Sequence, residues 1–219
     1  MDTAAVAFDL DDTLAVTTVD RTTLLREAME AVGAPPRSRQ AYLDAHADNL
    51  TARTREPVFE RLLDGAAADA NAAAVARAYR ERVNAALEPV PGVDRLLATL
   101  RERYRLGLLT NGPVRAQRSK LRTLGWTDTF DVTLVTGELA AGKPDRTAFE
   151  TLVDALDTPA AETVFVGDDV DADVRGATAA GLDAVQVLVP DGPEPDPTAF
   201  AHVDRDDLVE RLPAILAER

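Results

Sequence analysis

Near the start of the chain, a short apolar run leads directly into a group of carboxylates: Val6-Ala7-Phe8-Asp9-Leu10-Asp11-Asp12-Thr13-Leu14. An apolar run that ends on a polar turn is typical of a buried strand in a parallel sheet. Asp9 and Asp11 lie two residues apart, so both carboxylates can approach one point from an extended turn. A carboxylate can attack phosphorus, and a second carboxyl group can protonate the leaving oxygen. The same residues could also form a simple turn or helix cap.

Four further apolar runs follow this stretch, with amphipathic helical patterns between them. The runs cover residues 106–109, 132–135, 163–166 and 184–189. An exposed loop is expected after the last run, and a final helix at residues 206–216. Strands that alternate with helices predict right-handed βαβ units and a mostly parallel sheet. The predicted fold class is therefore α/β, with a Rossmann-like core, and ligands of such sheets bind at the carboxyl ends of the strands.

Residues 15–88 differ from the rest of the chain, because they lack convincing strand runs. Apolar residues at helical spacing predict three helices there, near residues 24–32, 58–63 and 70–87. We therefore expect a small all-helical domain, called the helical segment below, at residues 15–88. The remaining residues form the catalytic core, at 1–14 and 89–219.

Two short motifs follow the second and third apolar runs. A hydroxyl and backbone N–H groups at Thr110-Asn111-Gly112 can hold phosphate oxygens beside the start of a helix. The motif Gly142-Lys143-Pro144-Asp145 contains one of only two lysines in the chain. A fixed ammonium group would neutralise charge as a carboxylate and a phosphate approach each other. Taken alone, the first motif could be turn chemistry and the second a surface lysine before a helix.

The fourth apolar run is followed by four carboxylates within six residues, in Gly167-Asp168-Asp169-Val170-Asp171-Ala172-Asp173. Such a group repels itself unless a cation lies among its members, and Mg²⁺ prefers hard oxygen ligands. Aspartates are also common at helix N-termini, and we expect Asp171 to be such a cap or an exposed residue. Asp168 stands directly at the strand end and is the better candidate for a metal ligand.

The four motifs together resemble those of the haloacid dehalogenase superfamily of hydrolases, and they occur in that family's order. The resemblance covers residues 6 to about 188. It implies that Asp9 is a nucleophile that forms an aspartyl-phosphate, that Asp11 is the general acid–base, and that Lys143 stabilises the charge. The phosphate of the substrate is expected to bind at Thr110 and Asn111.

The resemblance also implies a magnesium site. In the family, Mg²⁺ is held by groups that match Asp9, the backbone carbonyl of Asp11, and Asp168. Asp173 matches an acid that orients the catalytic lysine or metal-bound water. One departure is Asp169, where many relatives carry a small hydroxyl residue. The helical segment matches the cap of the family, which closes over the site and reads the substrate.

Activities within the family can be separated by single residues. Dehalogenases lack a carboxylate two residues after the nucleophile, whereas Asp11 is present here, so phosphoryl chemistry is favoured. Phosphonate-cleaving members need a lysine in the cap, and residues 15–88 contain none. The sequence therefore predicts a phosphoric monoester hydrolase, a magnesium-dependent phosphatase that acts on a small phosphorylated metabolite. A sugar-phosphate mutase uses the same groups and stays an alternative, as does a binding module without catalysis.

Substrate choice is expected to depend on the helical segment. Arg53, Arg55 and Arg61 could meet an anionic tail such as a carboxylate or a second phosphate, although solvent-facing arginines are the simpler interpretation of each one alone. We expect His46 and His202 to be structural or surface residues and not ligands, because both lie outside the motifs. Phosphoglycolate, a sugar phosphate and a nucleoside monophosphate all stay open.

The composition excludes several classes of partner. The 219 residues include 38 Asp and Glu against 24 Lys and Arg, and the net charge of −14 argues against nucleic acid or an anionic membrane. No apolar run approaches the ~20 residues of a membrane helix, and the acidic N-terminus does not resemble a signal peptide. Since cysteine is also absent from the sequence, we expect a cytoplasmic protein. Nothing in the sequence indicates an oligomeric state.

The content of charged residues indicates the salt concentration in which the protein works. Lys120 and Lys143 are the only lysines, while Asp and Ala are abundant. This composition is typical of halophilic proteins, which work in a high-salt cytoplasm where repulsion between surface charges is screened.

The free energy of unfolding should therefore rise as KCl is added from millimolar to molar concentration, because salt screens the repulsion within an acidic surface. Thermal unfolding followed by circular dichroism across a KCl series measures this. Full stability at low salt would contradict the halophilic interpretation.

Overall fold

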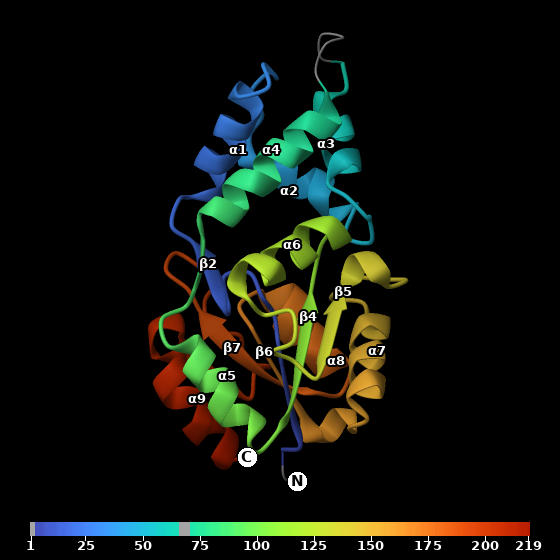
Figure 1. Ribbon diagram of the computed structural model, residues 1–219. Helices are drawn as coiled ribbons and strands as arrows, with labels where there is room; N and C mark the ends of the chain where they lie inside the picture. The colour runs from blue at the N-terminus through green and yellow to red at the C-terminus, as the bar shows by residue number, and fades with distance from the viewer. Residues whose placement is uncertain (1–2, 66–70) are drawn as a thin grey trace.

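A six-stranded parallel sheet forms the centre of the computed structural model, which describes residues 3–65 and 71–219 (Figure 1). Its strand order is β5-β4-β1-β6-β7-β8, and every neighbouring pair is parallel. The strands are β1 (Ala5–Phe8), β4 (Arg105–Thr110), β5 (Val132–Val135), β6 (Thr163–Gly167), β7 (Asp183–Leu188) and β8 (Ala201–Asp204). The predicted α/β fold class, with a Rossmann-like core, is confirmed.

Helices cover both faces of this sheet, so each strand is buried on two sides. Val6 and Phe8 of β1 point into one apolar cluster, and Ala5 and Ala7 point into another on the opposite face. The first cluster is completed by α5 (Val93–Arg101), α6 (Val114–Leu124) and α9 (Leu208–Ala217). The second is completed by α7 (Arg146–Leu156) and α8 (Gly176–Ala179).

Three strands were not expected from the sequence. β8 is an edge strand, which in the described part of the chain pairs with β7 alone. Val203 is its only buried residue. It therefore lacks the continuous apolar run of a central strand. β2 (Ala15–Thr17) pairs antiparallel with β3 (Leu87–Pro89), and this short ribbon joins the helical segment to the core.

In its described part, residues 15–65 and 71–88, the helical segment contains four helices, α1 (Arg21–Glu30), α2 (Arg39–Ala47), α3 (Glu56–Leu63) and α4 (Ala72–Ala85). α2 was not expected, because only Tyr42 and Ala45 of its residues are buried and they make too short an apolar stripe. The predicted start of the last helix, Ala70, lies outside the described residues. Buried residues of the four helices form an apolar cluster of their own.

Strand ends and the helical segment meet at one edge of the sheet. β1, β4 and β6 are adjacent and parallel, so their carboxyl ends lie together, and α1–α4 lie beyond this edge (Figure 1). After β1 the chain turns back sharply at Asp12, which has a φ of 62° and donates its N–H to the carbonyl of Ala15 at 2.9 Å. A left-handed conformation is more acceptable for aspartate than for most residues. This turn leaves Asp9 and Asp11 at the edge, facing the helical segment.

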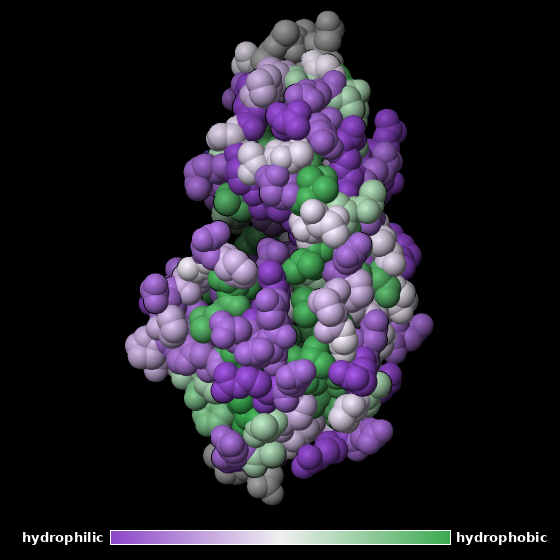
Figure 2. All heavy atoms as spheres, turned by 90° about the vertical axis from the view of Figure 1, so that its left-hand side faces the viewer, coloured by the Kyte–Doolittle hydropathy of each residue, from purple (hydrophilic) through white to green (hydrophobic). Residues whose placement is uncertain are grey.

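The outer surface is largely hydrophilic where Figure 2 shows the helical segment, and it is hollowed where that segment meets the core. Among the residues that the structure describes, no helix has the length and apolarity required to cross a membrane.

Candidate active site

A buried ammonium group joins the carboxyl ends of two neighbouring strands. Lys143 Nζ lies 2.6 Å from Asp9 Oδ1 and 2.6 Å from Asp173 Oδ1, and all three side chains are buried. Burial lowers the pKa of Lys143, but the charges of Asp173 and Asp9 raise it above its usual range, so the group stays protonated. Asp9 is also held by its backbone, because its N–H donates to the carbonyl of Val166 at 2.9 Å.

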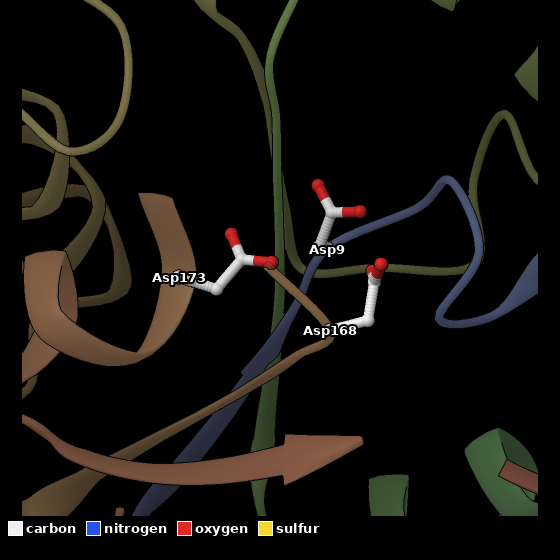
Figure 3. A group of neighbouring side chains, drawn as sticks. All are labelled: Asp9, Asp168 and Asp173. Carbon is white, nitrogen blue, oxygen red and sulfur yellow. The ribbon is translucent and has the colours of Figure 1, made fainter. Parts of the chain in front are cut away.

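Three carboxylates, from Asp9, Asp168 and Asp173, face a common space beside this ammonium group (Figure 3). One oxygen of each lies within 4.8 Å of the other two. Burial raises the pKa of Asp9 to about 7 and that of Asp168 to about 9, and repulsion from the neighbouring carboxylates contributes to both. Crowded carboxylate oxygens are the donors that Mg²⁺ prefers, and its charge would allow them to ionise together. The residues therefore fit a divalent cation.

Asp173 has both carboxylate oxygens engaged by the protein. Oδ1 accepts from Lys143, and Oδ2 accepts from the N–H of Asp169 at 3.1 Å. The carboxylate lies directly against Gly167, where an added Cβ would stand 2.3 Å from Asp173 Oδ2. Only glycine allows this close approach. These contacts suit the predicted role of orienting the lysine better than the role of a metal ligand.

The turn after β6 is organised by two further contacts. Thr13 Oγ1 donates to Asp168 Oδ1 at 2.7 Å, which holds that carboxylate toward the site. Asp169 caps the helical turn Val170–Arg175 by accepting from the N–H groups of Asp171 and Ala172. Asp171 is exposed, one of the two outcomes expected for it, and the cap is its neighbour Asp169.

Asp11 lies in a second cluster of charges, separate from the first. Arg21 NH2 is 2.7 Å from Asp11 Oδ1, Gln117 Nε2 is 2.9 Å from Oδ2, and Lys120 Nζ also bonds to Oδ2. Burial raises the pKa of Asp11, but the positive charges of Lys120 and Arg21 outweigh it and hold this pKa well below its usual range. Burial in turn lowers the pKa of Lys120 to about 7, with Asp11 opposing the shift.

The Thr110 motif stands between the two clusters. Thr110 Oγ1 accepts from Gln117 Nε2 at 2.6 Å, so a single amide links Thr110 to Asp11. Asn111 pairs reciprocally with the backbone of Lys143: its Nδ2 donates to the carbonyl at 2.8 Å, and its Oδ1 accepts the N–H at 2.9 Å. The N–H of Gly112 donates to Thr136 Oγ1. Asn111 therefore positions the lysine loop in addition to bordering the site.

A cavity of about 540 Å³ opens above these groups, between the core and the helical segment. The residues predicted for catalysis, phosphate binding and metal binding all line it: Asp9, Asp11, Thr110, Asn111, Lys143, Asp168 and Asp173. Of the three arginines predicted to meet a substrate, Arg55 lines the cavity, whereas Arg53 and Arg61 do not. The opposite wall comes from the helical segment, with Arg39, Tyr42, His46, Arg55 and Tyr79 among its residues.

Several residues of this site were missed by the sequence analysis. Gln117 and Thr13 carry no signal that marks them, and Arg21 is one of many arginines. Lys120 had a signal: it is one of two lysines in the chain, and both prove to be buried against site aspartates. His46 was expected to be structural or superficial, but it borders the cavity and its Nδ1 has no partner among the described residues. His202 is structural as expected, with Nε2 at 2.8 Å from the carbonyl of Asp196.

The chain thus has a parallel α/β core with a buried Asp–Lys–Asp group and crowded carboxylates at its strand ends. The chain belongs to the family of haloacid dehalogenase-like hydrolases, which it matches over residues 3–181. The predicted superfamily is therefore confirmed.

Curated relatives of the chain are phosphatases. The phosphoserine phosphatase of Thermus thermophilus is 40% identical over 149 residues, which are 65% of this chain and 59% of that protein. The glyceraldehyde 3-phosphate phosphatase of Methanopyrus kandleri is 32% identical over 199 residues, which are 84% of this chain and 83% of that protein. The chain thus covers less than two thirds of the first relative and most of the second. Both names agree with the predicted class of phosphoric monoester hydrolase.

Solved structures resemble the whole chain. The HAD-hydrolase YfnB of Bacillus subtilis, determined with bound magnesium, superposes with a TM-score of 0.76 over 99% of this chain and all of that one. At 21% sequence identity this likeness shows the fold alone.

Asp168→Asn should stabilise the protein against heat when divalent cations are absent. Because the pKa of Asp168 rises from 3.8 to about 9, the folded protein keeps a proton that the unfolded chain has lost, and the free energy of unfolding falls as the pH rises between those values. Asparagine carries no charge and can still accept from Thr13. With EDTA at about pH 8, the substitution removes the cost of keeping that proton, and the melting temperature should rise by roughly 2–4 °C for each kcal/mol added to the free energy of unfolding.

Added Mg²⁺ should raise the melting temperature of the unmodified protein and affect the Asp168→Asn variant much less, since binding to the folded state alone stabilises it. Scanning calorimetry with and without Mg²⁺ measures both effects. Equal melting temperatures in EDTA, together with an equal response to Mg²⁺, would remove Asp168 from the metal site.

Proposed function

We propose that the protein is a magnesium-dependent phosphatase that hydrolyses a small phosphorylated metabolite through an aspartyl-phosphate intermediate. The observation that carries the proposal is the Lys143 ammonium group, which holds Asp9 Oδ1 in a cavity that also contains the carboxyl group of Asp11. Two carboxyl groups in one cavity can serve as a nucleophile and an acid–base partner in phosphoryl transfer. The phosphatase activity of the curated relatives supports the same chemistry.

Asp9 is the proposed nucleophile. Lys143 occupies Oδ1, which leaves Oδ2 to attack phosphorus and form the acyl-phosphate bond as the leaving oxygen departs. Lys143 stays beside the carboxylate and offsets negative charge as the phosphate approaches. Thr110 and Asn111 lie at the same end of the cavity and are proposed to contact the phosphate oxygens. Mg²⁺ held by Asp9, Asp168 and the carbonyl of Asp11 would add the positive charge that keeps Asp9 ionised.

Asp11 is the proposed acid–base. Its contacts with Arg21 and Lys120 keep it ionised, which suits the second half of the reaction, when it takes a proton from the attacking water. In the first half it must give a proton to the leaving oxygen. A substrate phosphate beside Asp11 favours protonation of its carboxylate, because the anion repels the carboxylate and competes for Arg21 and Lys120.

The helical segment, residues 15–88, is proposed to be a cap domain over a core formed by residues 1–14 and 89–219. Its separate apolar cluster and its position across the cavity support this division. Arg21 belongs to the segment and Asp11 to the core, so any movement of the proposed cap would alter the charge beside the acid–base. The cytoplasmic and halophilic assignments stay proposals that rest on composition.

Asp9→Asn should abolish the release of phosphate from p-nitrophenyl phosphate in the presence of Mg²⁺, with kcat reduced by roughly three orders of magnitude or more, as for other catalytic nucleophiles. The matched control is Asp154→Asn, which changes an exposed carboxylate of α7 outside the cavity lining and should keep full activity. Full activity of Asp9→Asn would refute the nucleophile. An isomerised sugar phosphate in place of free phosphate would favour the mutase.

Asp11→Asn should slow the hydrolysis of an alkyl phosphate more than that of p-nitrophenyl phosphate. An alkoxide needs a proton as it leaves, whereas p-nitrophenolate does not, and general acid catalysis is worth roughly 10²–10⁴. The measurement compares kcat/KM for glycerol phosphate and p-nitrophenyl phosphate in both proteins. Asp12→Asn, at a position where asparagine tolerates the left-handed backbone, should leave the ratio unchanged. Equal losses for both substrates in Asp11→Asn would contradict the acid role.

A further inference from the structure

The wall of the cavity opposite the catalytic residues contains basic groups with no acidic partner. Arg55, which directly precedes α3, is 7% exposed, and its Nε and NH1 atoms are buried without a hydrogen-bond acceptor among the described residues. NH1 of Arg39 and Nδ1 of His46 are also buried without a hydrogen-bond partner among the described residues. All three residues line the cavity that holds Asp9.

Aromatic rings hold these groups in place. The guanidinium carbon of Arg55 lies 5.2 Å from the ring centre of Tyr79, and that of Arg39 lies 5.0 Å from the ring centre of Tyr42. The His46 ring stacks on Tyr42 at 5.7 Å. Stacking on an aromatic face fixes a guanidinium group and leaves its N–H edge for an anion. The cluster of Arg39, His46 and Arg55 is called the distal basic group below.

An unpaired buried guanidinium group is costly, since it has lost water and gained no counter-charge. The chain has 38 acidic residues, yet none of those in the described part pairs with Arg55. Other arginines of the helical segment behave differently: Arg61 is exposed and pairs with Asp48, and Arg53 is exposed and lies outside the cavity lining. Groups kept at such a cost in a binding cavity are typical of sites whose missing partner is the ligand.

The charge around the distal basic group is positive, whereas that around the metal site is negative. Arg55 also borders a small neighbouring cavity, whose charged lining residues are Arg77, Arg80 and Arg115 besides the single acid Glu56. Burial and the positive charge of Arg55 and Lys120 lower the pKa of His46 to about 3, so its imidazole is neutral. A neutral imidazole can still donate one N–H to an anion.

We propose that the distal basic group binds a second anionic group of the substrate, a carboxylate or a phosphate, at the end remote from the phosphate that is cleaved. Arg55 is the specificity-determining residue, and Arg39 and His46 add N–H donors. This inference deepens the proposed function and rests on it. The substrate class is therefore a phosphate monoester that carries a further acidic group, and a neutral sugar or alcohol phosphate is a poorer ligand.

Binding to the Asp9→Asn protein tests the proposal without requiring turnover. Titration calorimetry with Mg²⁺ compares two matched pairs of probes: phosphoglycolate with 2-hydroxyethyl phosphate, and fructose 1,6-bisphosphate with fructose 6-phosphate. The first pair differs by a carboxylate and the second by a phosphate, so the pairs separate the two kinds of anion. We expect at least one member with the extra anion to bind about 10- to 100-fold more tightly, the range of hydrogen bonds to charged groups.

Introducing Arg55→Gln into the Asp9→Asn protein should remove this preference. The dissociation constants of the neutral probes should change by no more than about threefold, because glutamine keeps a polar side chain but lacks the charge and the paired N–H donors of a guanidinium group. Arg53→Gln is the matched control and should change nothing. Arg55→Lys should lose part of the preference, and it serves as the test if the glutamine variant does not fold. Melting curves check folding.

Several results would overturn the proposal. One is an Asp9→Asn protein that binds each pair with equal affinity. Another is an Arg55→Gln variant that weakens charged and neutral probes equally, which would make Arg55 a structural residue. Failure of the proposed function looks different: the active protein would release no phosphate from any probe, while the binding preference for the second anion would persist.

Discussion

The ion pair that Lys143 makes with Asp9 and Asp173 is the constraint on which the rest of the site depends. One ammonium group, 2.6 Å from each carboxylate, joins the end of β1, the loop before α7 and the turn after β6. Breaking such a buried group by removing one member leaves an uncompensated charge, which is strongly destabilising. Two further residues support this arrangement. Gly167 has no Cβ that would overlap the Asp173 carboxylate, and Asn111 hydrogen-bonds to the backbone of Lys143.

Acidic and basic side chains occupy different parts of the cavity wall. Asp9 and Asp168 lie close together, and burial raises the pKa of both. Repulsion from Asp173 adds to each shift, and a bound cation would offset it. Asp11 lies beside them with two positive partners, Lys120 and Arg21. On the wall formed by the helical segment, Arg39 and Arg55 have buried nitrogen atoms without a hydrogen-bond partner among the described residues. In the proposed enzyme, the core recognises and transfers the phosphate, and the helical segment selects substrates by what lies at their other end.

The sequence predicted which residues gather at the strand ends better than it predicted the groups around them. Carboxylates and a lysine that follow apolar runs are visible in one dimension, because parallel strands bring their carboxyl ends together. Thr13, Gln117 and Arg21 could not be predicted, since their contacts depend on side-chain directions set by the turn at Asp12 and by the placement of α1 and α6. β8 and α2 were missed because an edge strand and a short, half-exposed helix need few apolar residues.

In the proposed mechanism, Asp9 carries the phosphoryl group during turnover. The most direct measurement is to quench the protein in acid during steady hydrolysis of p-nitrophenyl phosphate, reduce it with borohydride, and map the products by peptide mass spectrometry. Borohydride converts an acyl-phosphate to an alcohol and leaves a free carboxylate unchanged. Reduction is expected at residue 9, and it should depend on both substrate and Mg²⁺. Reduction at another carboxylate, or none while phosphate is being released, would contradict it.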